Sequence, residues 1–117
     1  MSGAPDGTVS LAFRMRVRPG MTDEYRRRHA EIWPEMVAAL RAEGIRRYEI
    51  FLCEDTREVF AFQLRATPPV TDPAAADPVI RRWRTHMADV LEMDGPMPLR
   101  LPLERVFLMT GPDAPQG

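Results

Sequence analysis

Hydrophobic and polar residues alternate along the first patterned segment of the chain. Four apolar positions, Leu11, Phe13, Met15 and Val17, are separated by Ala12, Arg14, Arg16 and Arg18. A period of two residues is typical of a strand with one buried face. The pattern therefore predicts a strand over residues 11–17, followed by a turn at Pro19-Gly20.

The next segment has helical periodicity. Its apolar side carries Tyr25, His29, Trp33, Met36, Val37 and Leu40. Thr22 is the expected N-cap, because two acidic residues follow it at the positive end of the helix dipole. Pro34 is expected to kink or split the helix near Trp33, because proline removes a backbone donor. Gly44 is the expected C′ residue that closes it.

Two strands and a second helix follow. Residues 47–53 and 58–64 are rich in strand formers, and the short connection between them predicts a hairpin. Prolines are expected to keep residues 67–78 irregular until Asp77-Pro78 begins a helix as N-cap and first helical residue. Its apolar stripe consists of Val79, Trp83, Met87, Val90 and Leu91. A loop over residues 94–102 and a last strand over residues 104–109 complete the expected elements.

The element order β-α-β-β-α-β predicts a ferredoxin-like plait, an α+β fold with a four-stranded antiparallel sheet and two helices on one face. The 117 residues are expected to form a single domain with an ordered core of about residues 9–110 and mobile ends at 1–7 and 111–117. Phe51, Phe60 and Phe62 place apolar side chains on the second face of the sheet. This predicts a homodimer in which two sheets pack face to face as a dimeric α/β barrel.

Composition excludes several kinds of chemistry. The 16 basic residues are all arginine, which rules out Schiff-base catalysis and a phosphate-binding lysine. Two serines near the N-terminus, one cysteine and two distant histidines give neither a serine hydrolase nor a zinc-binding pattern. A net charge of -1 gives no reason to expect nucleic acid or an anionic membrane as a partner. A single Cys53, no signal-peptide pattern and no long apolar run predict a soluble cytoplasmic protein without cofactor or metal.

Tyr25 and His29 are the first candidates for chemistry, because positions i and i+4 share one helical face. Imidazole can give or take a proton near neutral pH, a tyrosine can orient an oxygen, and the indole of Trp33 could stack on a sugar. The pattern alone leaves another interpretation open. A lone histidine is more often a structural or surface residue, and the aromatic residues would then be core or dimer contacts. The arginine run at residues 26–28 is interpreted as a solvated helix face.

One stretch strongly resembles a known family. Tyr25-Arg-Arg-Arg-His29-Ala-Glu-Ile-Trp33-Pro34-Glu35-Met36 is similar to the Y-x-x-R-H-x-x-I-W-P-E segment of the L-rhamnose mutarotase family. The resemblance continues through residues 44–52, 60–61, 83–90 and 104–107, in the same order, and spans about residues 10–110.

The resemblance implies a dimeric plait that interconverts the α and β anomers of L-rhamnose without a cofactor. It implies that His29 is the proton donor and that Tyr25, Tyr48 and Trp83 bind the sugar. The family usually has a second tryptophan where this chain has Arg84, so Arg84 is expected to contact the sugar and to influence which sugar is preferred.

Other points remain open at this stage. His86 occupies a position that relatives often fill with tyrosine, so it is not expected to be catalytic. The second proton-transfer group could be a carboxylate such as Asp89 or a bound water. The same architecture also occurs in cofactor-independent monooxygenases, and the aromatic residues would equally suit a non-catalytic binding module for a small ligand.

Overall fold

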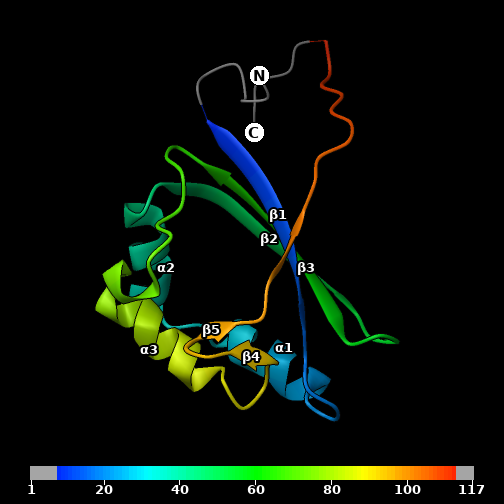
Figure 1. The fold of residues 1–117 in the computed structure, drawn as a ribbon, viewed down its shortest axis with the longest axis vertical. Helices are drawn as coiled ribbons and strands as arrows, with labels where there is room; N and C mark the ends of the chain where they lie inside the picture. Colours follow the sequence, from blue (N-terminus) through cyan, green and yellow to red (C-terminus); the bar gives the residue numbers. More distant parts are fainter. Residues whose placement is uncertain (1–7, 113–117) are drawn as a thin grey trace.

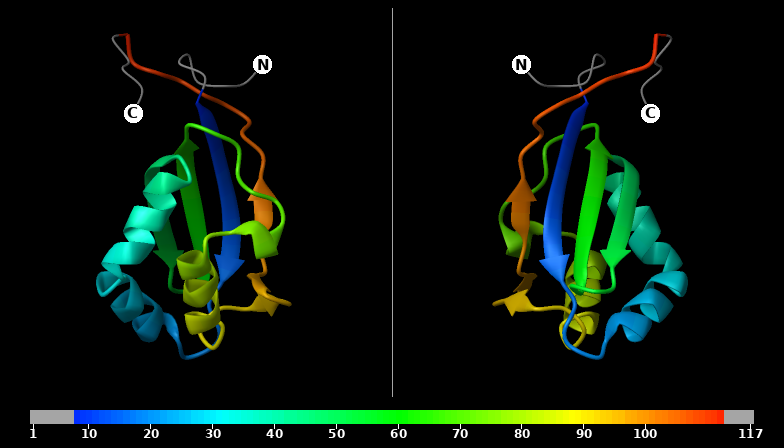
Figure 2. Two further views of the ribbon diagram at one scale, coloured as in Figure 1. Left: turned by 90° about the vertical axis from the view of Figure 1, so that its left-hand side faces the viewer. Right: turned by 90° about the vertical axis from the view of Figure 1, so that its right-hand side faces the viewer.

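A four-stranded antiparallel sheet forms the centre of the computed structural model, which describes residues 8–112. The strands are β1 (Val9–Arg16), β2 (Ile45–Cys53), β3 (Glu58–Arg65) and β6 (Leu101–Leu103). They lie in the order β2-β3-β1-β6, so the first and third strands are central and the last strand forms one edge. The helices cover one face of this sheet, and the other face has no helix over it (Figures 1 and 2). The predicted ferredoxin-like plait is confirmed.

Three α-helices lie on the covered face. They are α1 (Thr22–Ala30), α2 (Pro34–Ala42) and α3 (Pro78–His86), with a 3-10 turn, η1 (Pro73–Ala75), before the last. Pro34 splits the first predicted helix as expected, because the chain becomes extended at Trp33 (φ −64°, ψ 133°) and restarts with proline in the first turn. Gly44 has φ +97° immediately after the C-cap Glu43, which confirms it as the C′ residue.

The two predicted helix caps have different outcomes. Asp77 caps α3, since its carboxylate accepts a hydrogen bond from the backbone N–H of Val79 at 2.8 Å. Thr22 is not an N-cap: it is the first helical residue, and Met21 is the cap. The turn around Gly20 carries the chain into the helix one residue early, so that Tyr25 N–H already bonds the Met21 carbonyl oxygen at 2.9 Å.

Strand register determines which residues face the helices. Phe13 lies opposite Ala61, which lies opposite Ile50, and all three belong to the core or pack against it. The same face of β3 therefore also carries Gln63 and Arg65, because side chains alternate along a strand. The polar pair lies at the end of the sheet where α2 enters β2, and it becomes part of the cavity described below.

The prediction for the C-terminal strand was wrong. The strand that pairs with β1 is Leu101–Leu103, which begins inside the expected loop, and residues 104–109 have no regular secondary structure and are exposed. They leave the sheet edge and extend past the start of β1 (Figure 1). A strand-forming composition needs a neighbouring strand to pair with, and residues 8–112 offer none there. The expected loop also contains a two-residue hairpin, β4 (Met93–Asp94) with β5 (Met97–Pro98).

The face of the sheet without helices carries an exposed aromatic side chain. Phe51 is 60% exposed on this face and lies opposite Phe60. Residues 1–7 and 113–117, which include most of the predicted mobile ends, lie outside the described residues. Within the described part of the chain, no helix has the length and hydrophobicity needed to cross a membrane.

Candidate active site

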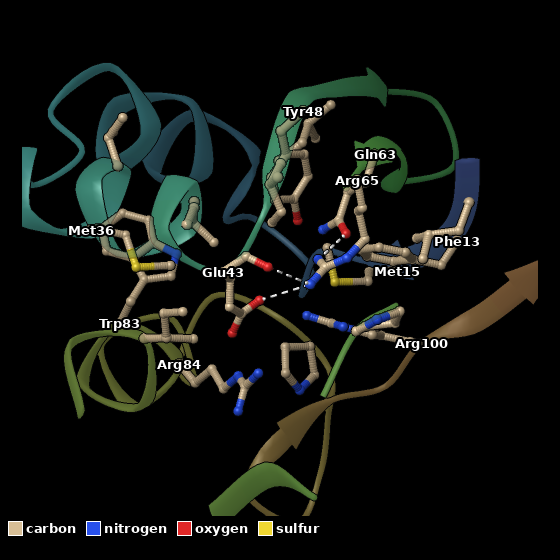
Figure 3. Close-up of a pocket in the computed structure, with 18 of the residues that line it drawn as sticks. Phe13, Met15, Met36, Glu43, Tyr48, Gln63, Arg65, Trp83, Arg84 and Arg100 are labelled. Atoms are coloured by element: carbon tan, nitrogen blue, oxygen red, sulfur yellow. Dashed lines mark hydrogen bonds and ion pairs between the residues drawn. The ribbon is translucent and has the colours of Figure 1, made fainter. Parts of the chain in front are cut away.

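A cavity of about 720 Å³ lies between the sheet and the helices. This volume falls in the range of about 300–1,000 Å³ that is typical of small-molecule sites. The five residues predicted from the sequence all line it: Tyr25, His29, Tyr48, Trp83 and Arg84. They come from α1, β2 and α3, so the plait brings together positions up to 59 residues apart in the chain. Figure 3 shows the cavity with several of its lining side chains.

His29 is held in one orientation by its own helix. Its Nδ1 lies 3.2 Å from the carbonyl oxygen of Tyr25, one turn earlier. A carbonyl oxygen only accepts hydrogen bonds, so Nδ1 carries the proton and Nε2 keeps its lone pair in the neutral ring. Burial lowers the pKa of His29 below its ordinary value of 6.5, while the hydrogen bond to the carbonyl opposes that effect. The resting imidazole is therefore neutral near pH 7, and it is a base at Nε2.

Tyr25 carries a polar group with no protein partner. Its side chain is 4% exposed, and its hydroxyl has no hydrogen bond to any described residue. Burial raises the pKa of this hydroxyl, and Tyr48 nearby raises it further. An unpaired buried hydroxyl costs free energy unless a ligand completes its hydrogen bonds. The Tyr25 ring packs beside His29, with ring centroids 4.4 Å apart, and both residues line the same cavity.

A polar network forms one end of the cavity. Arg65, only 2% exposed, donates to Gln63 Oε1 at 2.8 Å and to the Thr67 carbonyl oxygen at 2.9 Å, and pairs with Glu43 Oε1 at 3.2 Å. Gln63 also hydrogen-bonds Tyr48, whose pKa is raised by burial. The network fixes the Tyr48 ring on the cavity side of β2 (Figure 3).

Trp83 forms an aromatic wall next to the histidine. Its ring lies edge-on to His29, with centroids 5.5 Å apart and planes at 85°. Trp33 packs against Trp83 on the side away from the cavity, at 5.1 Å and 88°. Trp33 does not line the cavity, so the expectation that it continues the Tyr25 and His29 face and stacks on a sugar was wrong. The reason is the break at Pro34, which moves Trp33 off the helix.

His86 and Asp89 lie outside the cavity. His86 is exposed and packs on Trp33, with ring centroids 5.2 Å apart, which agrees with the expectation that it is not catalytic. Asp89 does not line the cavity either, and Arg28 holds it at 2.8 Å and keeps its pKa below the usual range. Asp89 is therefore removed as a candidate for the second proton-transfer group. The only carboxylate among the lining residues that the structure describes is Glu43.

The arginine run on α1 behaves mostly as expected. Arg26 and Arg27 form exposed ion pairs with acidic residues on and directly after the same helix, and Arg26 also pairs with Glu54 in the turn after β2. Arg28 does more than the sequence indicated: it bonds Glu24 one turn earlier and also reaches Asp89 and the carbonyl oxygen of His86. It thus ties α1 to the end of α3, and with them the two helices that carry His29 and Trp83.

Several lining residues were not predicted from the sequence: Glu43, Gln63, Arg65 and Arg100. A signal existed for two of them. Gln63 and Arg65 continue the alternation of Val59 and Ala61, which marks them as inward-facing polar residues on a central strand. Glu43 and Arg100 lie at a helix end and in a loop, where no periodicity indicates a direction.

The fold and the cavity define a small ferredoxin-like α+β protein with a cavity of small-molecule size beside a neutral histidine. A model of the L-rhamnose mutarotase family matches residues 10–109. The chain belongs to this family.

Individual relatives support the same family membership. The chain is 48% identical over 100 residues to an L-rhamnose mutarotase of Burkholderia ambifaria, covering 84% of this chain and 95% of that one. It is 44% identical over 100 residues to one of Paraburkholderia phytofirmans, covering 84% and 92%. Among solved structures, an L-rhamnose mutarotase from Formosa agariphila superposes with a TM-score of 0.74 at 34% identity, covering 86% of this chain and 98% of that one.

Proposed function

We propose that the protein is an isomerase that interconverts the α and β anomers of L-rhamnose in this cavity. Family membership supports the reaction, and one observation supports the site. A neutral histidine with a free Nε2 lines the same cavity as a buried tyrosine hydroxyl that has no protein partner. Anomer exchange needs only proton movements at two sugar oxygens, so these groups suffice in kind.

His29 acts first as a base and then as an acid. Its Nε2 takes the proton of the anomeric hydroxyl while the bond between the anomeric carbon and the ring oxygen breaks. The ring oxygen takes a proton from a bound water or a neighbouring hydroxyl. After rotation about the bond between the first two carbons, closure on the other face reverses both transfers. The imidazolium formed in the first half is then the proton donor, the role that the resemblance assigns to His29.

The required acceleration is modest. Sugars already exchange anomers in water, and general acid–base catalysis contributes typically ~10²–10⁴-fold. The reaction needs no cofactor on this account. In the described part of the chain, no group of three or more His, Cys, Asp or Glu residues is placed to hold a metal ion.

The remaining site residues bind and orient the sugar. The Tyr25 hydroxyl donates to a sugar oxygen near His29, and Tyr48 is fixed for the same purpose by Gln63. Trp83 presents an apolar surface to the C–H face of the ring. Arg84 donates from the half-buried end of α3 to sugar hydroxyls.

Saturation-transfer NMR on free L-rhamnose tests the proposal. With protein far below the sugar concentration, transfer between the two anomeric proton signals should exceed the buffer rate. A non-catalytic binding module would leave the exchange rate at the buffer value, even if it bound the sugar. Oxygen uptake with polycyclic aromatic substrates would instead indicate the monooxygenase alternative, which family membership does not favour.

We also propose a homodimer that packs through the sheet face without helices. Large apolar side chains are exposed on this face and along the segment after β6: Phe51, Leu101, Leu103, Val106, Phe107, Leu108 and Met109. A second copy would bury them and would offer the segment after β6 a pairing strand, which it lacks among the described residues of its own chain. A cytoplasmic location is part of the same proposal, because Cys53 is a free and exposed thiol that suits a reducing compartment.

A further inference from the structure

The cavity has a local excess of positive charge. Six arginines line it, Arg41, Arg46, Arg47, Arg65, Arg84 and Arg100, against one carboxylate, that of Glu43. The chain as a whole has a net charge of -1, so the excess belongs to the cavity and not to the protein. A neutral sugar does not require it.

The lining arginines differ in their partners. Arg65 pairs with Glu43 at 3.2 Å, and Arg47 pairs with Glu49 at 2.5 Å. Arg84 and Arg100 form no ion pair with any described residue. Arg84 has one long hydrogen bond, to the Pro73 carbonyl oxygen at 3.5 Å, and Arg100 lies over the Phe13 ring, 4.5 Å from its centroid.

The two guanidinium groups converge on the same part of the cavity. Arg84 extends from α3 and Arg100 from the segment before β6, and both groups lie beside the Glu43–Arg65 pair (Figure 3). Burial, and then the charge of Arg100, lower the pKa of Arg84. Arg84 is half-buried and Arg100 is exposed. Two like charges held close together are stabilised by an anion between them.

We propose that the cavity binds an aldose that carries an anionic group, and that Arg84 and Arg100 together hold this group. This inference rests on the proposed function, because it assigns a further substrate class to the same cavity. Guanidinium forks bind carboxylates and phosphates in a planar, bidentate geometry. The chemistry is therefore that of a hexuronate, with a carboxylate at the sixth carbon, or of a hexose 6-phosphate.

The anionic group lies away from the reacting carbon. A substituent on the anomeric oxygen would prevent ring opening, so the charge is carried at the opposite end of the ring. The cavity has such an arrangement in its aromatic wall: Trp83 lies against His29, and the next residue, Arg84, contributes to the charged end. A pyranose bound along this wall keeps its anomeric oxygen at the histidine and its sixth carbon near the arginines.

Exchange rates on matched sugars test the inference. Galacturonate, glucuronate and mannuronate are each compared with the neutral hexose of the same configuration and with its 6-phosphate, after subtraction of each sugar's own buffer rate. We expect at least one anionic sugar to exceed its neutral counterpart in catalytic efficiency by about tenfold, as one charge-assisted contact allows. The uronate and phosphate arms identify which anion is held.

Three variants separate the cavity charges from charge in general. In Arg84→Gln and Arg100→Gln, the ratio of anionic to neutral efficiency should fall about tenfold. Arg82→Gln is the matched control, because Arg82 lies on the same helix but lines a separate surface pocket with Trp33 and His86. Its ratio and its rates should match those of the parent protein.

Binding of methyl glycosides gives a readout that does not depend on turnover. A methyl glycoside cannot open its ring, so a methyl uronide and its neutral analogue report affinity alone. The uronide should bind more tightly, and this preference should fall with added salt and in Arg84→Gln. Equal affinities for uronide, phosphate and neutral analogue would overturn the inference, even if L-rhamnose exchange is catalysed. If the protein does not catalyse L-rhamnose exchange but still binds the uronide preferentially, the proposed function is refuted and the anion site is supported.

Discussion

Replacing Tyr25 by phenylalanine should stabilise the folded protein and lower its affinity for L-rhamnose. The hydroxyl is buried and has no partner among the described residues, so the folded state bears its desolvation cost without a hydrogen bond in return. Such a cost is about 1–3 kcal/mol. Phenylalanine keeps the ring that packs on His29 and removes only the oxygen. We expect a gain of about 1 kcal/mol in the free energy of unfolding, or about 4 °C in Tm.

The same change removes one donor to the substrate. A neutral hydrogen bond contributes about 0.5–1.5 kcal/mol, so the half-saturating concentration of L-rhamnose should rise by about two- to thirteenfold. Stability is measured by thermal and chemical unfolding without sugar, and affinity by saturation transfer over a range of sugar concentrations. Opposite signs in the two measurements are the distinctive result, since a merely structural role would move them together.

Tyr48→Phe is the matched control. Its hydroxyl hydrogen-bonds Gln63, so this variant should lose about 1 kcal/mol of stability where Tyr25→Phe gains it. If Tyr25→Phe is destabilised to the same extent, its hydroxyl has a partner in the free protein and the reasoning fails. If stability rises but the half-saturating concentration stays constant, the sugar is not the missing partner.

Three further predictions concern the base, the dimer and the buried ion pair. His29→Asn should reduce L-rhamnose exchange to near the buffer rate while leaving Tm within a few degrees, and full activity of the folded variant would refute the assignment of His29 as the base. In the parent protein, the exchange rate should be constant near neutral pH and should fall in acid at a pH below 6.5. The reason is that burial lowers the pKa of His29 and only the neutral ring is a base. Light scattering should give about twice 13.4 kDa, and Phe51→Glu should shift the protein to monomer, whereas a monomeric parent would contradict the sheet-to-sheet dimer. Glu43→Gln should lower the free energy of unfolding by about 2 kcal/mol in chemical unfolding, because it removes the charge that pairs with buried Arg65. Glu49→Gln is the control at an exposed ion pair and should change the free energy of unfolding by less than about 0.5 kcal/mol. Equal effects would show that the Glu43–Arg65 pair contributes no more to stability than an exposed pair.

The fold could be predicted from the sequence because its signals are local. Alternation over residues 11–17, the hairpin at residues 47–64 and the Asp77-Pro78 helix start each arise from a few neighbouring residues. The last strand was misplaced because its position depends on a pairing partner about 90 residues away in sequence. Residues 104–109 have a better strand composition than Leu101–Leu103, yet the latter lie opposite Ala12 to Arg14 and are paired.

The site was predictable in part for a related reason. Tyr25 and His29 share a helical face, so their contact follows from spacing alone. Trp33 follows the same spacing but lies outside the cavity, since the proline that breaks the helix also rotates the indole away. Arg100 is absent from any periodic pattern, because a loop residue points where tertiary packing directs it. The charge of the cavity therefore becomes visible only in three dimensions.

The cavity has two unlike ends, and the proposed proton transfer and the proposed anion selectivity each depend on one of them. At one end, Trp83 and the apolar core surround His29, and their burial is what keeps the imidazole neutral and able to accept a proton. At the other end, buried Arg65 is paired with Glu43 and hydrogen-bonded to Gln63 and the Thr67 carbonyl oxygen. The charge of Glu43 is therefore already balanced by Arg65, and the nearby Arg84 and Arg100 are not neutralised by it. A cation next to the histidine would lower its pKa further, and a carboxylate there would raise it. Separation of the two ends lets the charged residues select a ligand without changing the protonation state on which the chemistry depends.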